Sequence, residues 1–324
     1  MIKKGLSDFF NQNPNLKYLF FGGKGGVGKT VLAGITALYL SEKGKRVLLV
    51  STNPVHSLSG LLNEDVFGRE KKVSQTNLFA LEIDTKDVIL KKKNEIKEKI
   101  EWFLRFADIT GQKTEDFIES ATMNPAFEES AMFEKMVDLM FEDKYEIYVF
   151  DTAPTANARR LLGMSKVYTL WVEKMLASRK EAEELRKKLT FTKKEEKDPL
   201  LTYLLSFKER IERVHQLLTN PSLTAFFFVT LPEALPIAVI RRFIGWFKDF
   251  GIPVGGVIVN RVIDKKQVKE DAPEFVLNRI TMQERYLNEI NSSFENVLGI
   301  LPEMANEIRG VDKLKEAMTY LFSH

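Results

Sequence analysis

Apolar residues make up 44% and charged residues 29% of the 324-residue chain, a composition typical of a globular protein that can bury a sizeable core. The 48 lysines and arginines nearly balance the 45 aspartates and glutamates. The resulting net charge of +3 indicates neither a nucleic-acid footprint nor an acidic partner, so we expect no nucleic-acid binding. Cysteine is absent, which excludes disulfides, thiolate zinc sites, iron–sulfur clusters and cysteine nucleophiles.

The first residues do not read as an export signal, because polar residues between 8 and 14 interrupt any apolar stretch. No segment reaches the roughly 20 consecutive apolar residues that a membrane-spanning helix needs. We therefore expect a cytoplasmic protein.

Short apolar runs predict buried parallel strands, separated for the most part by helical patterns. The runs cover residues 17–22, 46–50, 77–84, 145–151, 223–230, 253–260 and 295–302. This alternation predicts an α/β fold with a doubly wound, mostly parallel sheet, in one domain spanning 1–324. Residues 86–142 and 164–219 break the alternation and predict an inserted α-helical subdomain. Their Lys/Glu runs are typical of a solvated helix face or a mobile loop.

A phosphate-binding loop is predicted between the first strand and the first long helix. Its residues are Gly23, Lys24, Gly25, Gly26, Val27, Gly28, Lys29 and Thr30, which fit the pattern G-x-x-x-x-G-K-[ST]. Glycines let backbone N–H groups close around phosphate oxygens, and the helix N-terminus adds partial positive charge. Lys29 would neutralise the β- and γ-phosphates, and the Thr30 hydroxyl would ligate Mg²⁺. The alternative is a glycine turn that carries Lys-Thr by chance.

Asp151 ends an apolar run and would orient the magnesium shell through water, as Walker-B acids do; a strand-end cap is the alternative. The predicted cofactors are thus ATP and Mg²⁺. The additional lysine, Lys24, makes the loop resemble those of MinD/ParA-type, nitrogenase-iron-protein-type and arsenite-pump-type ATPases. That resemblance implies a homodimer in which Lys24 reaches the nucleotide of the facing subunit, whereas a solvated loop lysine is the alternative.

Two further segments narrow the resemblance to one branch of these ATPases. Residues 51–59 (STNPVHSLS) and 151–155 (DTAPT) look like the switch segments of the tail-anchored-protein targeting ATPases of the guided-entry pathway and of the related arsenite-pump ATPase. Other similar stretches lie at 82–84, 218–237, 257–261 and 301–314, so the resemblance covers nearly the whole chain. It implies an ATPase whose dimer closes on ATP and binds the apolar transmembrane helix of a client membrane protein, with a membrane receptor as a further partner.

The resemblance also implies roles for two residues that would contact the adenine base of the nucleotide. Asn260 resembles the family asparagine that reads the adenine edge, and Pro302 would lie against the base. The alternatives are that Asn260 is an ordinary loop residue and that Pro302 only ends a strand.

The chain departs from the family at Asn53, where the family has an aspartate that polarises the attacking water. An amide cannot accept that proton, so Asn53 occupies the catalytic position without being a base, and we expect strong Mg-ATP binding with slow turnover. An engineered Asp→Asn exchange and a naturally slow enzyme both fit. Gly60 and Ala156-Asn157 also differ from the family pattern, which favours natural divergence as well.

The absence of cysteine is the second departure. Many relatives clasp zinc between subunits with a C-x-x-C pair, whose positions fall at Pro273 and Val276, so we expect no zinc. Arsenite activation in the pump branch uses thiols, so the absence of cysteine disfavours it. The iron-protein branch is excluded, because it needs cysteines to hold its cluster.

Six of the ten methionines lie between 123 and 175, and three of them, Met132, Met136 and Met140, repeat at helical spacing. In the family the corresponding helices form the client groove, and flexible thioethers suit varied apolar partners. An amphipathic helix that packs on the core is the alternative. Two other functions stay open: a nucleotide-gated holdase without hydrolysis, and a ParA-like DNA-associated ATPase, which the balanced charge disfavours.

Overall fold

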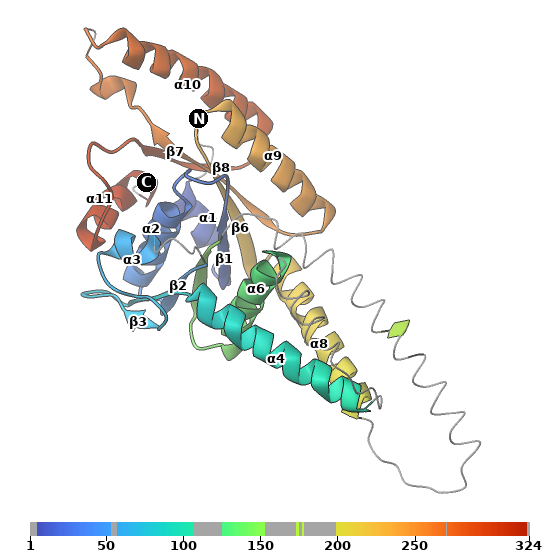
Figure 1. Ribbon diagram of the computed structural model, residues 1–324. Helices are drawn as coiled ribbons and strands as arrows, with labels where there is room; N and C mark the ends of the chain where they lie inside the picture. Colours follow the sequence, from blue (N-terminus) through green and yellow to red (C-terminus); the bar gives the residue numbers. More distant parts are fainter. Residues whose placement is uncertain are drawn as a thin grey trace, which may run out of the picture.

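The computed structural model describes residues 5–52, 57–106, 125–152, 173–174, 177, 199–269 and 271–322. Within them an eight-stranded sheet has the order β3-β4-β2-β5-β1-β6-β7-β8. The strands are β1 (Tyr18–Gly22), β2 (Val47–Ser51), β3 (Lys71–Lys72), β4 (Leu78–Glu82), β5 (Ile147–Asp151), β6 (Thr224–Thr230), β7 (Val254–Val262) and β8 (Val297–Pro302). Every pair is parallel except β3 with β4. The predicted α/β class with a mostly parallel sheet is confirmed (Figure 1).

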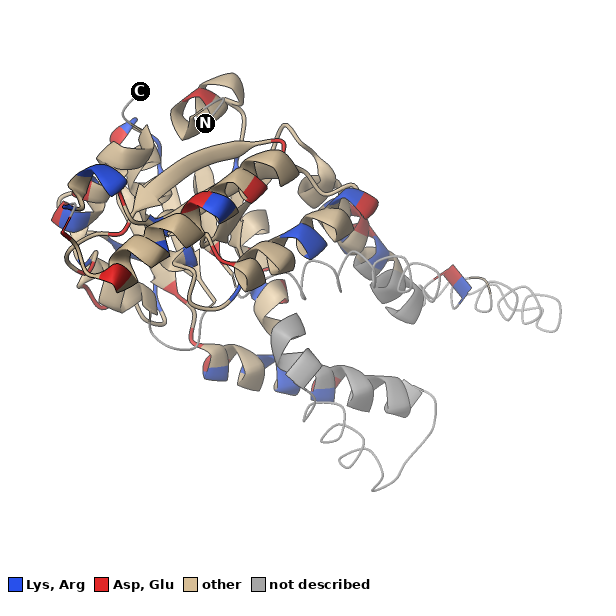
Figure 2. Ribbon diagram, turned by 90° about the horizontal axis from the view of Figure 1, so that it is seen from above, with Lys and Arg blue, Asp and Glu red and all other residues tan. Residues whose placement is uncertain are grey.

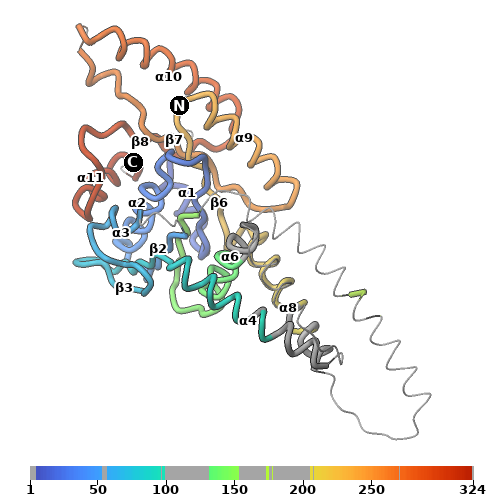
Figure 3. Tube along the Cα trace, in the orientation of Figure 1, coloured from blue at the N-terminus to red at the C-terminus, as the bar shows by residue number. Residues whose placement is uncertain are grey.

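Helices cover both faces of this sheet (Figures 1 and 3). They are α1 (Leu6–Gln12), α2 (Lys29–Glu42), α3 (Ser57–Leu62), α4 (Thr85–Phe106), α6 (Pro125–Glu142), α8 (Pro199–Thr219), α9 (Ala234–Asp249), α10 (Glu274–Ser293) and α11 (Val311–Phe322), with a 3₁₀ turn at Lys265–Gln267. Helices α1, α2, α3 and α11 contribute to one buried cluster, and α4, α6, α8, α9 and α10 to the other. The sheet therefore forms the middle of three layers.

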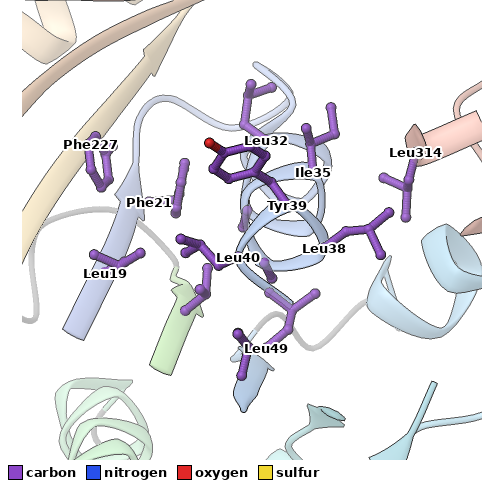
Figure 4. Packing of buried hydrophobic residues seen from close by; sticks show 14 of the residues in the cluster. Leu19, Phe21, Leu32, Ile35, Leu38, Tyr39, Leu40, Leu49, Phe227 and Leu314 are labelled. Atoms are coloured by element: carbon purple, nitrogen blue, oxygen red, sulfur yellow. The ribbon is translucent and has the colours of Figure 1, made fainter. Parts of the chain in front are cut away.

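Alternate residues of each central strand enter opposite clusters, as strand geometry requires. In β1, Leu19 and Phe21 face α2, whereas Tyr18 and Phe20 face the other layer. Figure 4 shows Leu19 and Phe21 beside the apolar side chains of α2. On the opposite face the Phe20 ring stacks on Phe226 with centroids 4.4 Å apart. These contacts hold β1, the strand that leads into the phosphate-binding loop, at the centre of both cores.

Strand order places the phosphate-binding loop at the switch point of the sheet. From β1 the chain runs through α2 to β2, on the far side of β5, whereas β6 lies on the other side of β1. In doubly wound sheets ligands bind at the carboxyl ends of the strands at such a point. The loop after β1 leaves at that edge.

The predicted helical insertions lie only partly within the described residues. Helices α4, α6 and α8 lie within or at the bounds of 86–142 and 164–219, while 107–124, 153–172, 175–176 and 178–198 lie outside the described residues. The Lys/Glu-rich face of α4 carries ion pairs, and Lys92 Nζ lies 2.6 Å from Glu134 of α6. Figure 2 shows acidic and basic residues interspersed along the described helices. In the described part of the chain no helix is both long and apolar enough to span a bilayer.

Candidate nucleotide-binding site

The loop between β1 and α2 has the open backbone that a phosphate needs. Gly26 and Gly28 have φ values of 79° and 93°, which side-chain-bearing residues adopt only under strain. Gly25 and Gly26 are exposed, and a Cβ at either position would meet nothing within 4 Å. Because α2 begins at Lys29, its first N–H groups point toward this same space. The loop therefore presents backbone donors and a helix N-terminus to solvent, which suits an anion.

Lys29 brings a cation to the loop. Its Nζ donates to the Lys24 carbonyl oxygen at 3.3 Å, so the side chain folds back along the loop. Burial lowers the pKa of Lys29, and the negative charge of Asp151 opposes that change. A lysine that is partly stripped of water beside open N–H groups gains from a phosphate that replaces the lost solvation.

Asp151 joins two hydroxyl groups at the same edge. It ends β5, is 2% exposed, and its Oδ2 accepts hydrogen bonds from Thr30 Oγ1 at 2.6 Å and Ser51 Oγ at 3.3 Å. Burial raises the pKa of Asp151, and the Thr30 hydrogen bond acts against that rise. One carboxylate and two hydroxyls form an all-oxygen donor set of the kind that Mg²⁺ prefers. These residues therefore fit a hydrated magnesium ion next to the phosphate loop.

Asn260 fastens the loop from β7. Its side chain is 4% exposed, its Nδ2 donates to the Val27 carbonyl at 2.9 Å, and its Oδ1 accepts from the Arg261 N–H at 2.9 Å. A Cβ at Gly28 would overlap the Asn260 amide nitrogen. The Asn260 amide thus positions the loop in this structure. Its NH₂ group carries a second N–H that can donate to a base, and the adenine contact stays a prediction. Pro302 pairs with Val262 at the ends of β8 and β7, on the same edge of the sheet.

Comparison with known proteins agrees with this geometry. The model of a family described as anion-transporting ATPase matches residues 16–323. The chain belongs to the anion-transporting ATPase family. It is 32% identical over 309 residues, 94% of the chain and 99% of the relative, to a protein of Aquifex aeolicus that bears the name putative arsenical pump-driving ATPase 2. It is 29% identical to ATPase GET3A of Arabidopsis thaliana (96% and 83% covered) and 28% identical to ATPase ASNA1 homolog 2 of Paramecium tetraurelia (94% and 93% covered).

The proposed catalytic position of this ATPase, Asn53, lies outside the described residues, as do 54–56. Both flanks are described. The Thr52 N–H donates to the Asp151 carbonyl at 3.2 Å, and α3 begins at Ser57. Thr52, the last described residue before Asn53, therefore lies beside Asp151.

The methionines of the predicted stripe are buried in the described residues. Met132, Met136 and Met140 of α6 are 7%, 4% and 2% exposed and belong to the cluster on the α6 face of the sheet. Their burial agrees with the alternative interpretation of a helix packed on the core, and a part in a client groove stays a prediction. Met123, Met164 and Met175 lie outside the described residues.

Two residues at this edge of the sheet enter the sequence-based prediction without a role of their own. Ser51 enters it only as the first residue of the stretch 51–59, yet its hydroxyl donates to Asp151. Glu82 enters that prediction only as part of a similar stretch, yet its fully buried carboxylate accepts hydrogen bonds from α3. For Glu82, the available signal is an acidic residue at the end of an apolar run. Ser51 gives no such signal, because a small polar residue at the end of a strand does not indicate a role.

Proposed function

We propose that this ATPase is a homodimer that binds Mg-ATP and uses dimer closure to bind the apolar transmembrane segments of tail-anchored membrane proteins for targeting. The convergence of the phosphate loop, Lys29 and Asp151 supports the nucleotide part. The segments 51–59 and 151–155, with relatives named GET3A and ASNA1 homolog, support the targeting part. A cytoplasmic location and a membrane receptor belong to the same proposal.

In this proposal the nucleotide acts through residues at one edge of the sheet. Loop N–H groups and Lys29 bind the β- and γ-phosphates, while Thr30 and Asp151 hold the hydrated metal. Bound Mg²⁺ would neutralise charge on the phosphate oxygens. Lys24 reaches the nucleotide of the facing subunit, so ATP binds the closed dimer more tightly than the open one and shifts the population toward it.

Composition argues against the arsenite-pump function. Arsenite is held by soft thiolate ligands, and the chain has no cysteine. The same absence means that zinc cannot clasp the dimer through cysteines. We therefore propose a dimer held by nucleotide and protein contacts, with no stimulation of turnover by arsenite.

The first test concerns Asn53. Replacing Asn53 with aspartate supplies a carboxylate that can accept the proton of the attacking water, and general bases contribute about 10²–10⁴-fold. Steady-state ATP turnover is expected to rise by about 100-fold, with little change in KM. If the aspartate variant turns over no faster than the parent chain, position 53 is not the missing base. If neither protein hydrolyses ATP, the nucleotide-gated holdase, which keeps ATP without hydrolysis, becomes the better description.

The second test concerns the client. A tail-anchored membrane protein is co-expressed with the ATPase and purified through it, with and without Mg-ATP. Retention is expected to need ATP and to fall at least about tenfold in Lys29→Ala, because the loop then lacks its phosphate-binding cation. Lys45→Ala is the matched control, since Lys45 forms an exposed ion pair with Glu146 away from the loop. If no apolar helix is retained by the parent chain under either condition, client binding is excluded.

A further inference from the structure

The end of β7 departs from regular strand geometry next to the phosphate-binding loop. Between the paired positions 259 and 262, β7 has two residues, Asn260 and Arg261, where β8 has one, which is the pattern of a β-bulge. Arg261 has a φ of 56°, a left-handed conformation that is strained for a residue with a side chain. Such strain persists only where the surrounding contacts hold the backbone in place. The bulge bears on the loop because Asn260, its first residue, donates to the Val27 carbonyl.

Gln283 of α10 holds the backbone that follows the bulge. Its Oε1 accepts a hydrogen bond from the Ile263 N–H at 3.0 Å, and its Nε2 donates to the Ile263 carbonyl at 2.6 Å. Gln283 is 4% exposed, and buried bonds of this kind are costly to lose. One amide that bonds to both main-chain groups of a residue fixes its orientation as well as its position. Ile263 therefore cannot turn without breaking both bonds.

Asn260 and Gln283 act on β7 from opposite faces of the sheet. Val27, to which Asn260 donates, belongs to the buried cluster on the α2 side. Helix α10 packs on the other side, where its Ile290 is fully buried. The Asn260 Oδ1 also accepts the Arg261 N–H at 2.9 Å. The bulge is thus held by Asn260 on the loop side and by Gln283 on the α10 side.

Loss of the Gln283 contacts would release the strain at Arg261. Ile263 lies two residues beyond Arg261, so a freed Ile263 lets the Arg261 backbone return to the negative φ that residues with side chains prefer. That rotation turns the peptide that follows Asn260 and draws its amide away from Val27. The binding-competent form of the loop is then less populated, and the apparent affinity for a nucleotide falls in the same proportion.

We propose that Gln283 is a positioning residue for nucleotide binding, which holds the bulge at Arg261 and thereby keeps Asn260 on the phosphate-binding loop. It acts through the backbone and touches no nucleotide. The inference rests on ATP binding at residues 23–30, which is part of the proposed function, and on neither dimerisation nor client binding.

The test compares Gln283→Met with Thr224→Val in the full-length chain. Methionine is close to glutamine in size and shape, but its thioether is a weak acceptor and no donor, so the two bonds to Ile263 are lost. Thr224 is the matched control because it is fully buried and its hydroxyl donates to the Leu217 carbonyl at 2.7 Å. It begins β6, beside the start of β1 and at the opposite end of that strand from the loop. The Kd for Mg-ATP by calorimetric titration and kcat at saturating ATP are measured at a temperature where all variants are folded.

For Gln283→Met we expect the Kd for Mg-ATP to rise about tenfold, the size of effect that loss of a buried hydrogen bond produces. The kcat at saturation should stay within about threefold, because bound nucleotide restores the loop. Thr224→Val is expected to lower Tm and to change neither constant. Gln283→Asn keeps an amide but draws it back by one methylene. It is expected to raise the Kd about threefold, which keeps the test informative if Gln283→Met does not fold.

Arg261→Gly separates positioning from a general loss of packing. Glycine adopts a positive φ without strain, so the bulge no longer depends on Gln283. In an Arg261→Gly background, Gln283→Met is expected to change the Kd by less than about twofold. The reference for that comparison is Arg261→Gly alone, so effects of losing the arginine side chain cancel.

Two results would overturn this role for Gln283 and leave the proposed function intact. A Kd for Gln283→Met within about twofold of the parent would mean that the loop does not depend on Gln283. An equally large rise in Kd with and without Arg261→Gly would mean that Gln283 does not act through the bulge. A parent chain that binds no Mg-ATP would refute the nucleotide part of the proposed function, and this inference with it.

Discussion

Asp151→Asn is expected to make the nucleotide-free ATPase more stable and at the same time about 100-fold or more slower. Asparagine keeps an oxygen that can accept the Thr30 and Ser51 hydroxyls, while the buried negative charge disappears. The metal then loses its anionic partner, and charge stabilisation of this kind is worth several kcal/mol in the transition state. Thermal unfolding and ATP turnover of the two proteins measure both effects.

The stability gain is expected to depend on pH in a defined direction. Burial raises the pKa of Asp151 above the value of 3.8 that it has when unfolded. At pH below 3.8 the carboxyl is neutral in both states and adds no penalty. As pH rises from there through the raised folded value, ionisation increasingly favours the unfolded state. The Tm advantage of Asp151→Asn should therefore be largest near neutral pH and vanish in acid.

Asp138→Asn provides the control for the gain in stability. Asp138 is partly exposed and pairs with Arg210, so its replacement removes a charge that burial does not penalise in the same way. No rise in Tm is expected. An Asp151→Asn protein that is less stable than the parent at neutral pH would show that the carboxylate is net stabilising in the empty site.

Gly28→Ala is the second substitution with a large expected effect. The left-handed conformation costs a non-glycine residue about 1–2 kcal/mol, and the added Cβ would displace the Asn260 amide from its bond to Val27, at about 1–3 kcal/mol more. Unfolding free energy should fall by about 2–5 kcal/mol. ATP binding should also be lost, because the loop can no longer keep its open shape.

Gly44→Ala separates the two causes. Gly44, just after α2, has a φ of 85°, and a Cβ added there would meet nothing within 4 Å, so only the backbone conformation contributes a cost. The free energy of unfolding of Gly44→Ala should fall by about 1–2 kcal/mol, with ATP affinity intact. Equal losses for Gly28→Ala and Gly44→Ala would mean that the Asn260 contact adds nothing to stability.

The sheet could be predicted from sequence because its strands are short apolar runs that are buried on both faces. The run at 145–151 and the strand at Ile147–Asp151 illustrate this, and the glycine loop placed the site at the end of β1. Strand β3 could not be predicted, since it consists of two lysines that pair antiparallel with β4 at the sheet edge. Nothing in its local pattern distinguishes it from a loop.

Contacts between residues far apart in the sequence could not be predicted from local sequence patterns. Asn260 and Val27 are 233 positions apart, so their hydrogen bond follows only from the strand order that brings β7 next to the loop. The α6 methionines show a different limit. Helical periodicity reveals that Met132 and Met136 share a face, but a face that packs on the core and one that lines a groove have the same period.

The site assignment is tested most directly by calorimetric titration of the parent chain and the Gly28→Ala and Gly44→Ala variants with Mg-ATP. The parent and Gly44→Ala are expected to bind one ATP per chain with similar affinity, and Gly28→Ala to show no saturable binding. Titrations at a temperature where all three are folded keep stability out of the comparison. If Gly28→Ala binds ATP as tightly as the parent, the loop of residues 23–30 is not the nucleotide site.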